Sequence, residues 1–322
     1  MTEVPASHAP SVEGALRLPF LQKRKKGKFR EIEAPRLLAF VADTHAHLEM
    51  LEDPAANLAR CAYYGVSFVC AMADPAEDAD TTLGMVDKWL VSAEALLADA
   101  GLEGYIDRLP DVRVAMGCHP HNAKDYDDVL EAVLAKRLKD PRICALGEVG
   151  LDYHYNLSPR DVQREVFRRQ IRLAKEAGLP LILHMREAHD EGFALLKEEG
   201  FPEAGVLLHC FNLDANVLKP WADEGCYVAY GGPLTFKNAD EVREGAQHVA
   251  LDRLLTETDS PYMTPEPMRG MECGPEHVVF TAARLAEVRA CRNEEEVRSL
   301  LDQVHRNARS LLDREPTDWQ CS

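Results

Sequence analysis

The chain has 322 residues, of which 46% are hydrophobic and 28% are charged, and this composition is typical of a folded protein with a large core. Its formal net charge of −17 argues against a broad basic surface for sequence-independent binding of nucleic acid. The longest apolar stretches fall short of the roughly 18 residues that a membrane span requires. The first residues also lack the pattern of a secretory signal, so we expect a cytoplasmic protein with no membrane partner.

The N-terminal segment differs from the rest of the chain in its charge. Residues 1–40 carry eight basic and four acidic side chains, a balance of +4 that leaves −21 for the remainder. Most of these cations lie between Lys23 and Arg30. We interpret residues 1–36 as a basic arm, for which a solvated tether is favoured over a phosphate-binding role.

Eight short apolar segments follow the arm, and each has a length typical of a β-strand. They lie around residues 38–43, 66–72, 112–117, 143–147, 180–184, 206–209, 226–230 and 253–257. The segments between them have helical spacing, which predicts parallel βαβ units. Eight such units match an α/β fold of the (β/α)8 TIM barrel type, and a doubly wound open sheet is the alternative.

Three other segments complete the predicted organisation. The region 74–110 is long for one crossover and predicts an additional helix. Helical spacing is clearest at 159–177, and an amphipathic pattern over 294–313 predicts a C-terminal helix that closes the barrel. We therefore place the barrel domain at 37–315 and a flexible tail at 316–322.

Polar side chains follow most of the predicted strands. The first strand leads into Asp43, His45 and His47, which alternation along a strand would place on one face. Later strand ends supply further imidazoles and carboxylates, namely His119, His121, Glu148, His184, His209, Glu257 and Asp259. In a closed barrel the C-terminal strand ends converge on one rim, where such a cluster would bind divalent metal. This distribution favours the barrel over the open sheet.

These segments resemble the successive motifs of the TatD family of metal-dependent hydrolases, which are amidohydrolase-like (β/α)8 barrels. The resemblance extends from about residue 40 to residue 313. Six ordered motifs carry it: Asp43-Thr44-His45-Ala46-His47-Leu48, Gly117-Cys118-His119-Pro120-His121, Gly147-Glu148-Val149-Gly150-Leu151-Asp152-Tyr153, Leu183-His184, His209-Cys210-Phe211 and Glu257-Thr258-Asp259-Ser260-Pro261-Tyr262.

The resemblance implies a site for two divalent metal ions, with Zn²⁺, Mn²⁺, Mg²⁺ and Fe²⁺ all open. His45 and His47 would hold the first metal together with Asp259. The second metal would be held by His184 and His209, and Glu148 would bridge the pair. Two neighbouring cations need an anion between them, so a glutamate among imidazoles suits this role. Glu148 and Asp259 are the expected catalytic residues, and Asp259 would orient the nucleophile or accept its proton.

Other residues near the predicted site receive less specific roles. Contact with a substrate phosphate is predicted for His119, His121 and Arg186, although the two histidines could instead orient metal ligands. We expect a role in orienting metal ligands or neighbouring loops for Asp43, Asp152 and Glu257. The chain departs from the family motifs at Met185, Asn212 and Cys273-Gly274-Pro275, which leaves the substrate more open than the type of reaction.

The resemblance implies an enzyme that hydrolyses ester bonds, and we expect a deoxyribonuclease that trims DNA ends as a 3'-5' exonuclease through a metal-bound hydroxide. The negative barrel does not oppose this, because a strand end can reach a recessed site whose metals supply positive charge. Two alternatives stay open: a small-molecule amidohydrolase or esterase with the same site, and a metal-binding scaffold without catalysis. The sequence indicates no oligomeric state.

Overall fold

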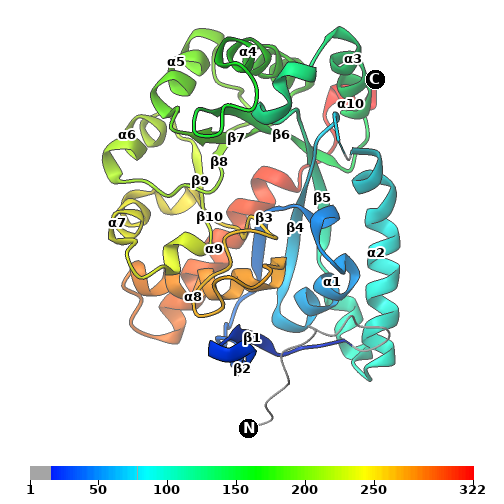
Figure 1. The fold of residues 1–322 in the computed structure, drawn as a ribbon, viewed down its shortest axis with the longest axis vertical. Helices are drawn as coiled ribbons and strands as arrows, with labels where there is room; N and C mark the ends of the chain where they lie inside the picture. Colours follow the sequence, from blue (N-terminus) through cyan, green and yellow to red (C-terminus); the bar gives the residue numbers. More distant parts are fainter. Residues whose placement is uncertain (1–15, 78) are drawn as a thin grey trace.

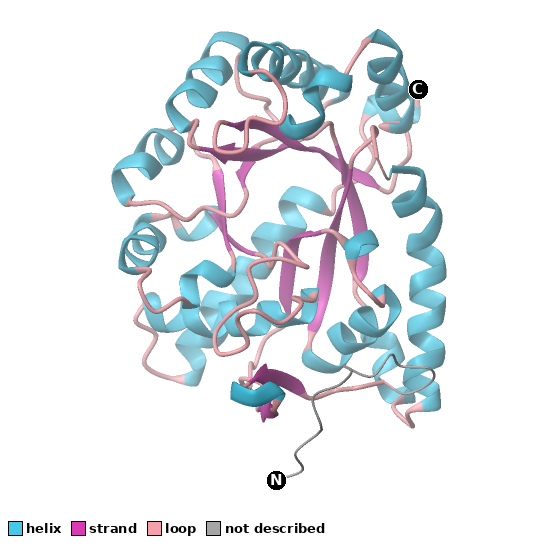
Figure 2. Ribbon diagram, in the orientation of Figure 1, coloured by secondary structure: helices cyan, strands magenta, loops and turns pink. Residues whose placement is uncertain are grey.

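Eight parallel strands form the centre of the protein, and helices surround them (Figures 1 and 2). The structure is a computed structural model and describes residues 16–77 and 79–322. The strands are β3 (Val41–Ala46), β4 (Val66–Ala73), β5 (Asp111–Met116), β6 (Ile143–Asp152), β7 (Leu181–Arg186), β8 (Val206–Leu208), β9 (Tyr227–Tyr230) and β10 (Leu254–Thr256). They lie side by side in sequence order from β3 to β10. This order confirms the predicted (β/α)8 barrel.

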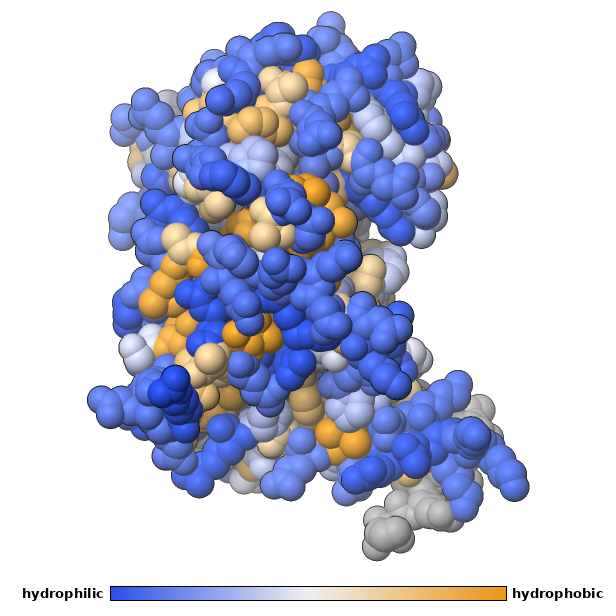
Figure 3. All heavy atoms as spheres, turned by 90° about the vertical axis from the view of Figure 1, so that its left-hand side faces the viewer, coloured by the Kyte–Doolittle hydropathy of each residue, from blue (hydrophilic) through white to orange (hydrophobic). Residues whose placement is uncertain are grey.

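Helices follow the strands around the barrel. They are α1 (Pro54–Tyr64), α2 (Ala79–Asp99), α3 (Asp128–Arg137), α4 (Arg160–Ala177), α5 (His189–Glu199), α6 (Ala215–Asp223), α7 (Asp240–His248), α8 (Val278–Val288), α9 (Glu294–Leu312) and α10 (Asp318–Cys321). The helices predicted at 159–177 and 294–313 are present as α4 and α9, and α2 occupies the long region 74–110. Within the described residues, none of the helices is long and apolar enough to cross a membrane. The surface seen in Figure 3 is mostly hydrophilic.

Alternation along the strands divides the core into two parts. Side chains on one face pack against the helices, and those on the other face fill the barrel interior, among them Phe68, Ile182, Leu207 and Leu255. The end of α9 packs on this interior cluster through residues such as Leu311. In Figure 1 α9 lies behind the strands, so it covers the end of the barrel away from the viewer.

Threonine side chains join the first and last strands of the barrel. The Thr44 hydroxyl donates to the Thr256 carbonyl at 3.1 Å, and the Thr256 hydroxyl donates to the Ala42 carbonyl at 2.8 Å. Just beyond β10, Ala46 and Ser260 form a parallel bridge. These contacts hold the end of β10 beside the end of β3, which brings the two halves of the predicted site together.

The first barrel strand begins later than the apolar run predicted. The sequence placed its start near residue 38, whereas β3 begins at Val41. Pairing explains the difference: Val41 is the first residue of β3 that faces β4, opposite Val66. A parallel strand exists only where a neighbour supplies backbone partners, so apolar residues ahead of that neighbour do not extend it.

Two barrel strands carry bulges beside the predicted site. The pairing register shifts within 43–46 on β3 and within 146–149 on β6. In each stretch the strand advances by three residues while its neighbour advances by two. His45 and Glu148 lie in these two irregular stretches. Bulges redirect side chains and are frequent next to active sites. The strict alternation expected for the first motif therefore does not apply through its whole length.

The described part of the predicted N-terminal arm forms a hairpin, while its residues 1–15 lie outside the described residues. Strands β1 (Phe20–Lys23) and β2 (Phe29–Ile32) pair antiparallel. At the other end of the chain, the segment predicted as a tail contains α10. There the Gln320 amide donates to three carbonyl oxygens, including that of Ile143 at 2.8 Å.

An ion pair on the outside of the barrel joins α1 to the segment before α8. The Arg60 Nε atom lies 2.8 Å from Glu276 Oε1, and the Glu276 side chain is only 2% exposed. Burial by itself raises the pKa of Glu276, but the charges of Arg60 and His277 outweigh it and hold the pKa below its usual value. Glu276 is therefore ionised in the folded protein at neutral pH, and its ionised form is stabilised by these partners.

We expect Arg60→Ala to lower the free energy of unfolding at pH 7 by about 3 kcal/mol, because it leaves a buried carboxylate without its guanidinium partner. The folded pKa of Glu276 is depressed, so its stabilising contribution is present above the unfolded pKa and is lost as the pH falls through the folded pKa. The difference between wild type and variant should therefore shrink towards pH 4. Urea unfolding at both pH values measures it.

The matched control is Arg60→Lys, which keeps the positive charge and should recover part of the stability. Arg60 also stacks on the Phe20 ring, with its guanidinium carbon 4.8 Å from the ring centroid. Equal destabilisation at both pH values would assign the loss to this stacking and contradict the role of the ion pair.

Candidate metal centre

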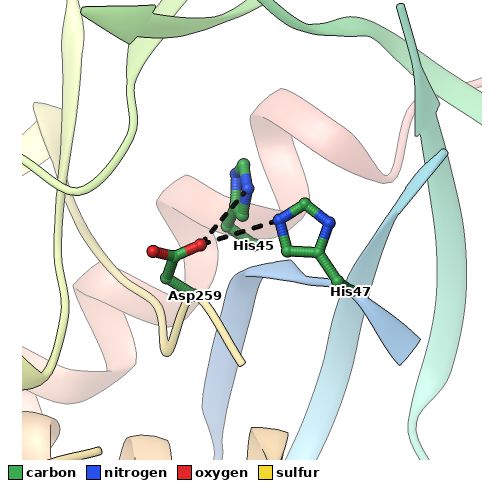
Figure 4. Close-up of side chains that lie close together, drawn as sticks. All are labelled: His45, His47 and Asp259. Carbon is green, nitrogen blue, oxygen red and sulfur yellow. Dashed lines mark ion pairs between the residues drawn. The ribbon is translucent and has the colours of Figure 1, made fainter. Parts of the chain in front are cut away.

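His45 and His47 at the end of β3 face Asp259, which follows β10 (Figure 4). Asp259 Oδ1 lies 3.8 Å from His45 Nε2 and 3.7 Å from His47 Nε2. The two imidazole rings are 5.2 Å apart between centroids, and one ligand atom from each of the three residues lies within 4.8 Å of the others. This group can hold one cation.

Glu148 lies between this group and a second set of imidazoles. Its Oε2 atom is 3.2 Å from His45 Nε2 and 3.7 Å from His47 Nε2. Its Oε1 atom is 2.5 Å from His184 Nδ1 and 2.8 Å from His209 Nε2. Each carboxylate oxygen therefore faces a different set of histidines, which is the arrangement that a bridging ligand requires.

Glycines on β6 allow Glu148 to lie this close to β7. A Cβ atom at Gly147 would be 2.6 Å from the Cβ of Ile182, closer than two carbons can pack. Gly150 has φ +143°, and a Cβ atom there would lie 2.1 Å from the His184 carbonyl oxygen. Only glycine fits such a close approach and such a backbone angle. The Gly-Glu-Val-Gly motif thus positions the carboxylate beside His184.

His119, which follows β5, also faces Glu148. Its Nε2 atom lies 3.5 Å from Glu148 Oε1, and His119, Glu148 and His184 form another group whose ligand atoms lie within 4.8 Å of one another. The sequence assigned His119 to substrate contact or to orienting ligands. The structure places His119 among the residues that could bind metal directly. Its position after the end of β5 is compatible with this role.

Asp152 contacts two of the predicted site residues. Its Oδ2 atom lies 2.8 Å from His121 Nε2 and 3.2 Å from His184 Nε2. Since Glu148 faces the other nitrogen of the His184 ring, the two carboxylates hold this imidazole from both sides. A partner on the second ring nitrogen orients a metal-binding histidine, which is the role predicted for Asp152. His121 lines the cavity.

Asp43 and Glu257 lie behind the predicted ligands. Asp43 Oδ1 accepts hydrogen bonds from the backbone of His45 at 3.2 Å and of Thr258 at 2.9 Å, which ties the end of β3 to the end of β10. Glu257 accepts from the backbone of Cys210, and its Oε1 atom lies 3.6 Å from His209 Nδ1. Both positions suit the orienting roles that the sequence analysis gave these residues.

The chemistry of these donors fits a divalent cation. His45 is fully buried, yet neither of its ring nitrogens has a hydrogen-bond partner within the described part of the chain. Burial lowers the pKa of His45 to about 4, so its imidazole is neutral at pH 7, which is the form that binds metal. Burial raises the pKa of Glu148, but the surrounding histidines outweigh it and hold the carboxyl ionised. An orphaned neutral imidazole beside a carboxylate is a natural metal ligand set.

The imidazole of His47 carries a proton at pH 7 when no metal is bound. Burial lowers the pKa of His47, but the nearby carboxylates of Asp259 and Glu148 outweigh this effect and raise the pKa to about 9. A cation held by His47 and Asp259 would replace that proton, because only the neutral imidazole coordinates.

A cavity of about 440 Å³ opens above the candidate metal centre. The predicted residue Arg186 lines it, and the Arg186 guanidinium carbon lies 4.6 Å from the centroid of the Tyr155 ring. Sequence reasoning missed other lining residues, among them Asp74, Tyr155 and Tyr262. Asp74 directly follows β4, so the strand-end argument could have found it. The two tyrosines lie in loops, where no periodic signal distinguishes them.

Three comparisons relate the chain to known proteins. The family described as TatD related DNase matches residues 42–313. The uncharacterized metal-dependent hydrolase YcfH of Escherichia coli K12 is 35% identical over 262 residues, which cover 80% of this chain and 91% of that protein. The human protein named 3'-5' RNA nuclease TATDN2 is 34% identical over 181 residues, 54% of this chain and 24% of the human one.

Among solved structures, YJJV, a TATD homolog from Escherichia coli K12, superposes with a TM-score of 0.69 at 27% identity and covers 85% of this chain and 98% of its own. The family match covers all of the barrel except the first residue of β3, and it includes all six predicted metal ligands. The chain therefore belongs to the TatD family of metal-dependent hydrolases.

Proposed function

We propose that the protein is a two-metal deoxyribonuclease that shortens single-stranded DNA from its 3' end. The observation that carries the proposal is the position of Glu148, whose two oxygens face separate groups of imidazoles. One metal would bind His45, His47 and Asp259, and the other would bind His184 and His209, with His119 close by. Two cations held this way would supply an acidified water and positive charge against the oxygens of a phosphodiester.

The side chains of the cavity would perform the remaining steps. Asp259 faces the cavity and would accept the proton of the attacking water. The Arg186 guanidinium, supported by the Tyr155 ring, is suited to bind a non-bridging phosphate oxygen through paired hydrogen bonds. Tyr262, in the loop after β10, offers a second aromatic surface, and single-stranded bases stack on such rings.

The charge of the cavity explains why metal would be needed for substrate entry as well as for chemistry. Five carboxylates line it, from Glu49, Asp74, Glu77, Glu148 and Asp259, against the single guanidinium of Arg186 among the same lining residues. Two divalent ions would replace the proton of His47 and offset the four carboxylate charges that Arg186 leaves unbalanced.

Metal removal tests the proposal. Protein treated with a chelator should not shorten single-stranded DNA, and addition of Mn²⁺, Mg²⁺, Zn²⁺ or Fe²⁺ should restore shortening with two ions bound per chain. DNA labelled at its 5' end should yield a ladder of progressively shorter products, because trimming begins at the 3' end. Metal analysis and denaturing gels measure both results.

The same experiment separates the alternatives. RNA of the same sequence is included because the human relative is named an RNA nuclease. Preferential shortening of RNA would identify RNA, in place of DNA, as the substrate. Cuts inside the strand would contradict trimming from an end. Release of product from acylated small molecules alone would favour an esterase or amidohydrolase. Two bound metals without turnover of any substrate would favour a scaffold.

A further inference from the structure

The N-terminal hairpin concentrates positive charge on a strongly negative protein. We name residues 20–32, which comprise β1, β2 and their turn, the basic hairpin. It contains six cationic side chains and one acidic one, and the cations are Lys23, Arg24, Lys25, Lys26, Lys28 and Arg30. All six are exposed. The basic hairpin precedes residues 42–313, so it is not part of the segment that matches the family.

Most of these cations are available to a partner. Among the residues that the structure describes, Lys23, Lys25, Lys26 and Arg30 form no ion pair with an acidic side chain, whereas many other basic residues of the barrel do. The Arg24 guanidinium contacts only a neutral group, the Gln22 amide oxygen at 3.3 Å. Exposed like charges this close together repel one another, which a bound polyanion would relieve.

The basic hairpin is anchored to the barrel by its first strand. Phe20 is 1% exposed and packs against Tyr64, His277 and Phe280 with ring centroids 4.6 to 4.9 Å apart. The Tyr64 hydroxyl donates to the Leu18 carbonyl at 2.5 Å. These contacts fix the hairpin between α1 and α8, so its charges are held at a definite place.

The basic hairpin contacts a loop whose other residues line the cavity. We name residues 257–274, which follow β10, the pocket loop; it carries Asp259, Tyr262 and Met263, all of which line the cavity. The Gln22 amide donates to the carbonyl of Pro267 in the pocket loop at 2.8 Å. The cations begin at the next residue. Figure 1 shows the hairpin at the lower edge of the barrel, next to the orange segments that include this loop and α8.

We propose that the basic hairpin binds the phosphate backbone of the substrate strand outside the cavity while the strand end lies at the metals; this inference rests on the proposed function. The cavity is lined by five carboxylates and a single guanidinium, and the protein carries −17 overall, so an anionic strand needs attraction elsewhere. None of the hairpin residues lines the cavity, so they would contact phosphates away from the cleaved bond.

An anionic membrane is a weaker match for this surface. Membrane-binding basic segments combine cations with exposed apolar side chains that insert between lipids. In the basic hairpin the apolar residues Phe20, Leu21, Phe29 and Ile32 are buried or half-buried. The exposed surface thus offers charge without an apolar anchor, as phosphate-backbone binding requires.

The test replaces three exposed lysines of the hairpin together, Lys23→Ala, Lys25→Ala and Lys26→Ala. Binding of labelled single-stranded DNA of about 20 nucleotides, long enough to extend beyond one site, is measured in chelator at several salt concentrations with the full chain. Loss of three phosphate contacts should weaken binding about tenfold at low salt and reduce the slope of log affinity against log salt by about 2. With metal present, kcat/KM for bis(p-nitrophenyl) phosphate should not change, because this substrate cannot reach the hairpin.

The matched control replaces Lys88, Lys136 and Lys219 by alanine, which changes the net charge equally on the exposed surfaces of α2, α3 and α6. Equal weakening by both triple variants would overturn the inference and leave only a net-charge effect. Unchanged DNA binding with reduced binding to phosphatidylserine vesicles would also overturn it. Hairpin-dependent binding without any strand shortening would contradict the proposed function and support the hairpin as a nucleic-acid surface.

Discussion

Replacement of Glu148 by glutamine should reduce the proposed rate of DNA shortening by about a thousandfold, since its charge would hold the two proposed metals, whose contribution to the barrier would be several kcal/mol. Glutamine has the same shape but no charge, so it cannot offset two neighbouring cations. Metal content should fall from two ions per chain to one or none. Kinetics at saturating metal and elemental analysis of the dialysed protein measure the two effects.

Glu203→Gln is the matched control, because Glu203 is exposed in the loop before β8 at the opposite end of the barrel strands. It should keep both metals and full activity. The circular dichroism of the chelated Glu148→Gln protein tests whether the fold persists. A variant that retains two metals and turns over DNA at the wild-type rate would contradict the bridging role.

The second large effect is expected from Asp259→Asn, which should lower kcat by about a hundredfold or more through loss of the proton acceptor. Asp259 has φ +60°, in the left-handed region, where asparagine is tolerated nearly as well as aspartate. The backbone should therefore remain in place. With both metals bound, KM for DNA should change little, because Arg186 and the aromatic rings of the cavity are untouched.

Asp252→Asn provides the comparison for this variant. Asp252 is exposed just before β10, at the other end of the strand that leads to Asp259. Its replacement removes the same charge without touching the cavity, so activity should stay at the wild-type value. Equal loss in both variants would mean that the rate depends on overall charge, and a large rise in KM for Asp259→Asn alone would assign Asp259 to substrate binding.

The Glu148→Gln variant also tests how the histidines would be shared between the two proposed metals. His209 lies near Glu148 Oε1, yet its ring also stacks on that of His45, with centroids 3.9 Å apart. His119 and His184 form a group with the same carboxylate oxygen. Metal analysis of the Glu148→Gln protein would show whether the remaining imidazoles hold one ion without the bridge.

The sequence by itself determined the barrel and most of the residues that converge on it. The hydrophobic periodicity of a strand or a helix is a local property. The alternation of strands and helices could therefore be predicted from short stretches such as 66–72 and 159–177. Motif residues at strand ends could be assembled because parallel strands of a barrel share one C-terminal rim. For this reason His45, Glu148, His184, His209 and Asp259 were all expected near one another.

The tertiary structure alone decided how these residues face one another. His45 and Glu148 lie in the bulges at 43–46 and 146–149, and these bulges depend on register with neighbouring strands. The start of β3 likewise followed its pairing with β4 and not its own apolar run. Contact between the basic hairpin and the pocket loop joins residues 245 positions apart, Gln22 and Pro267. Such distances arise from closure of the barrel, because local periodicity carries no information about which distant segments meet.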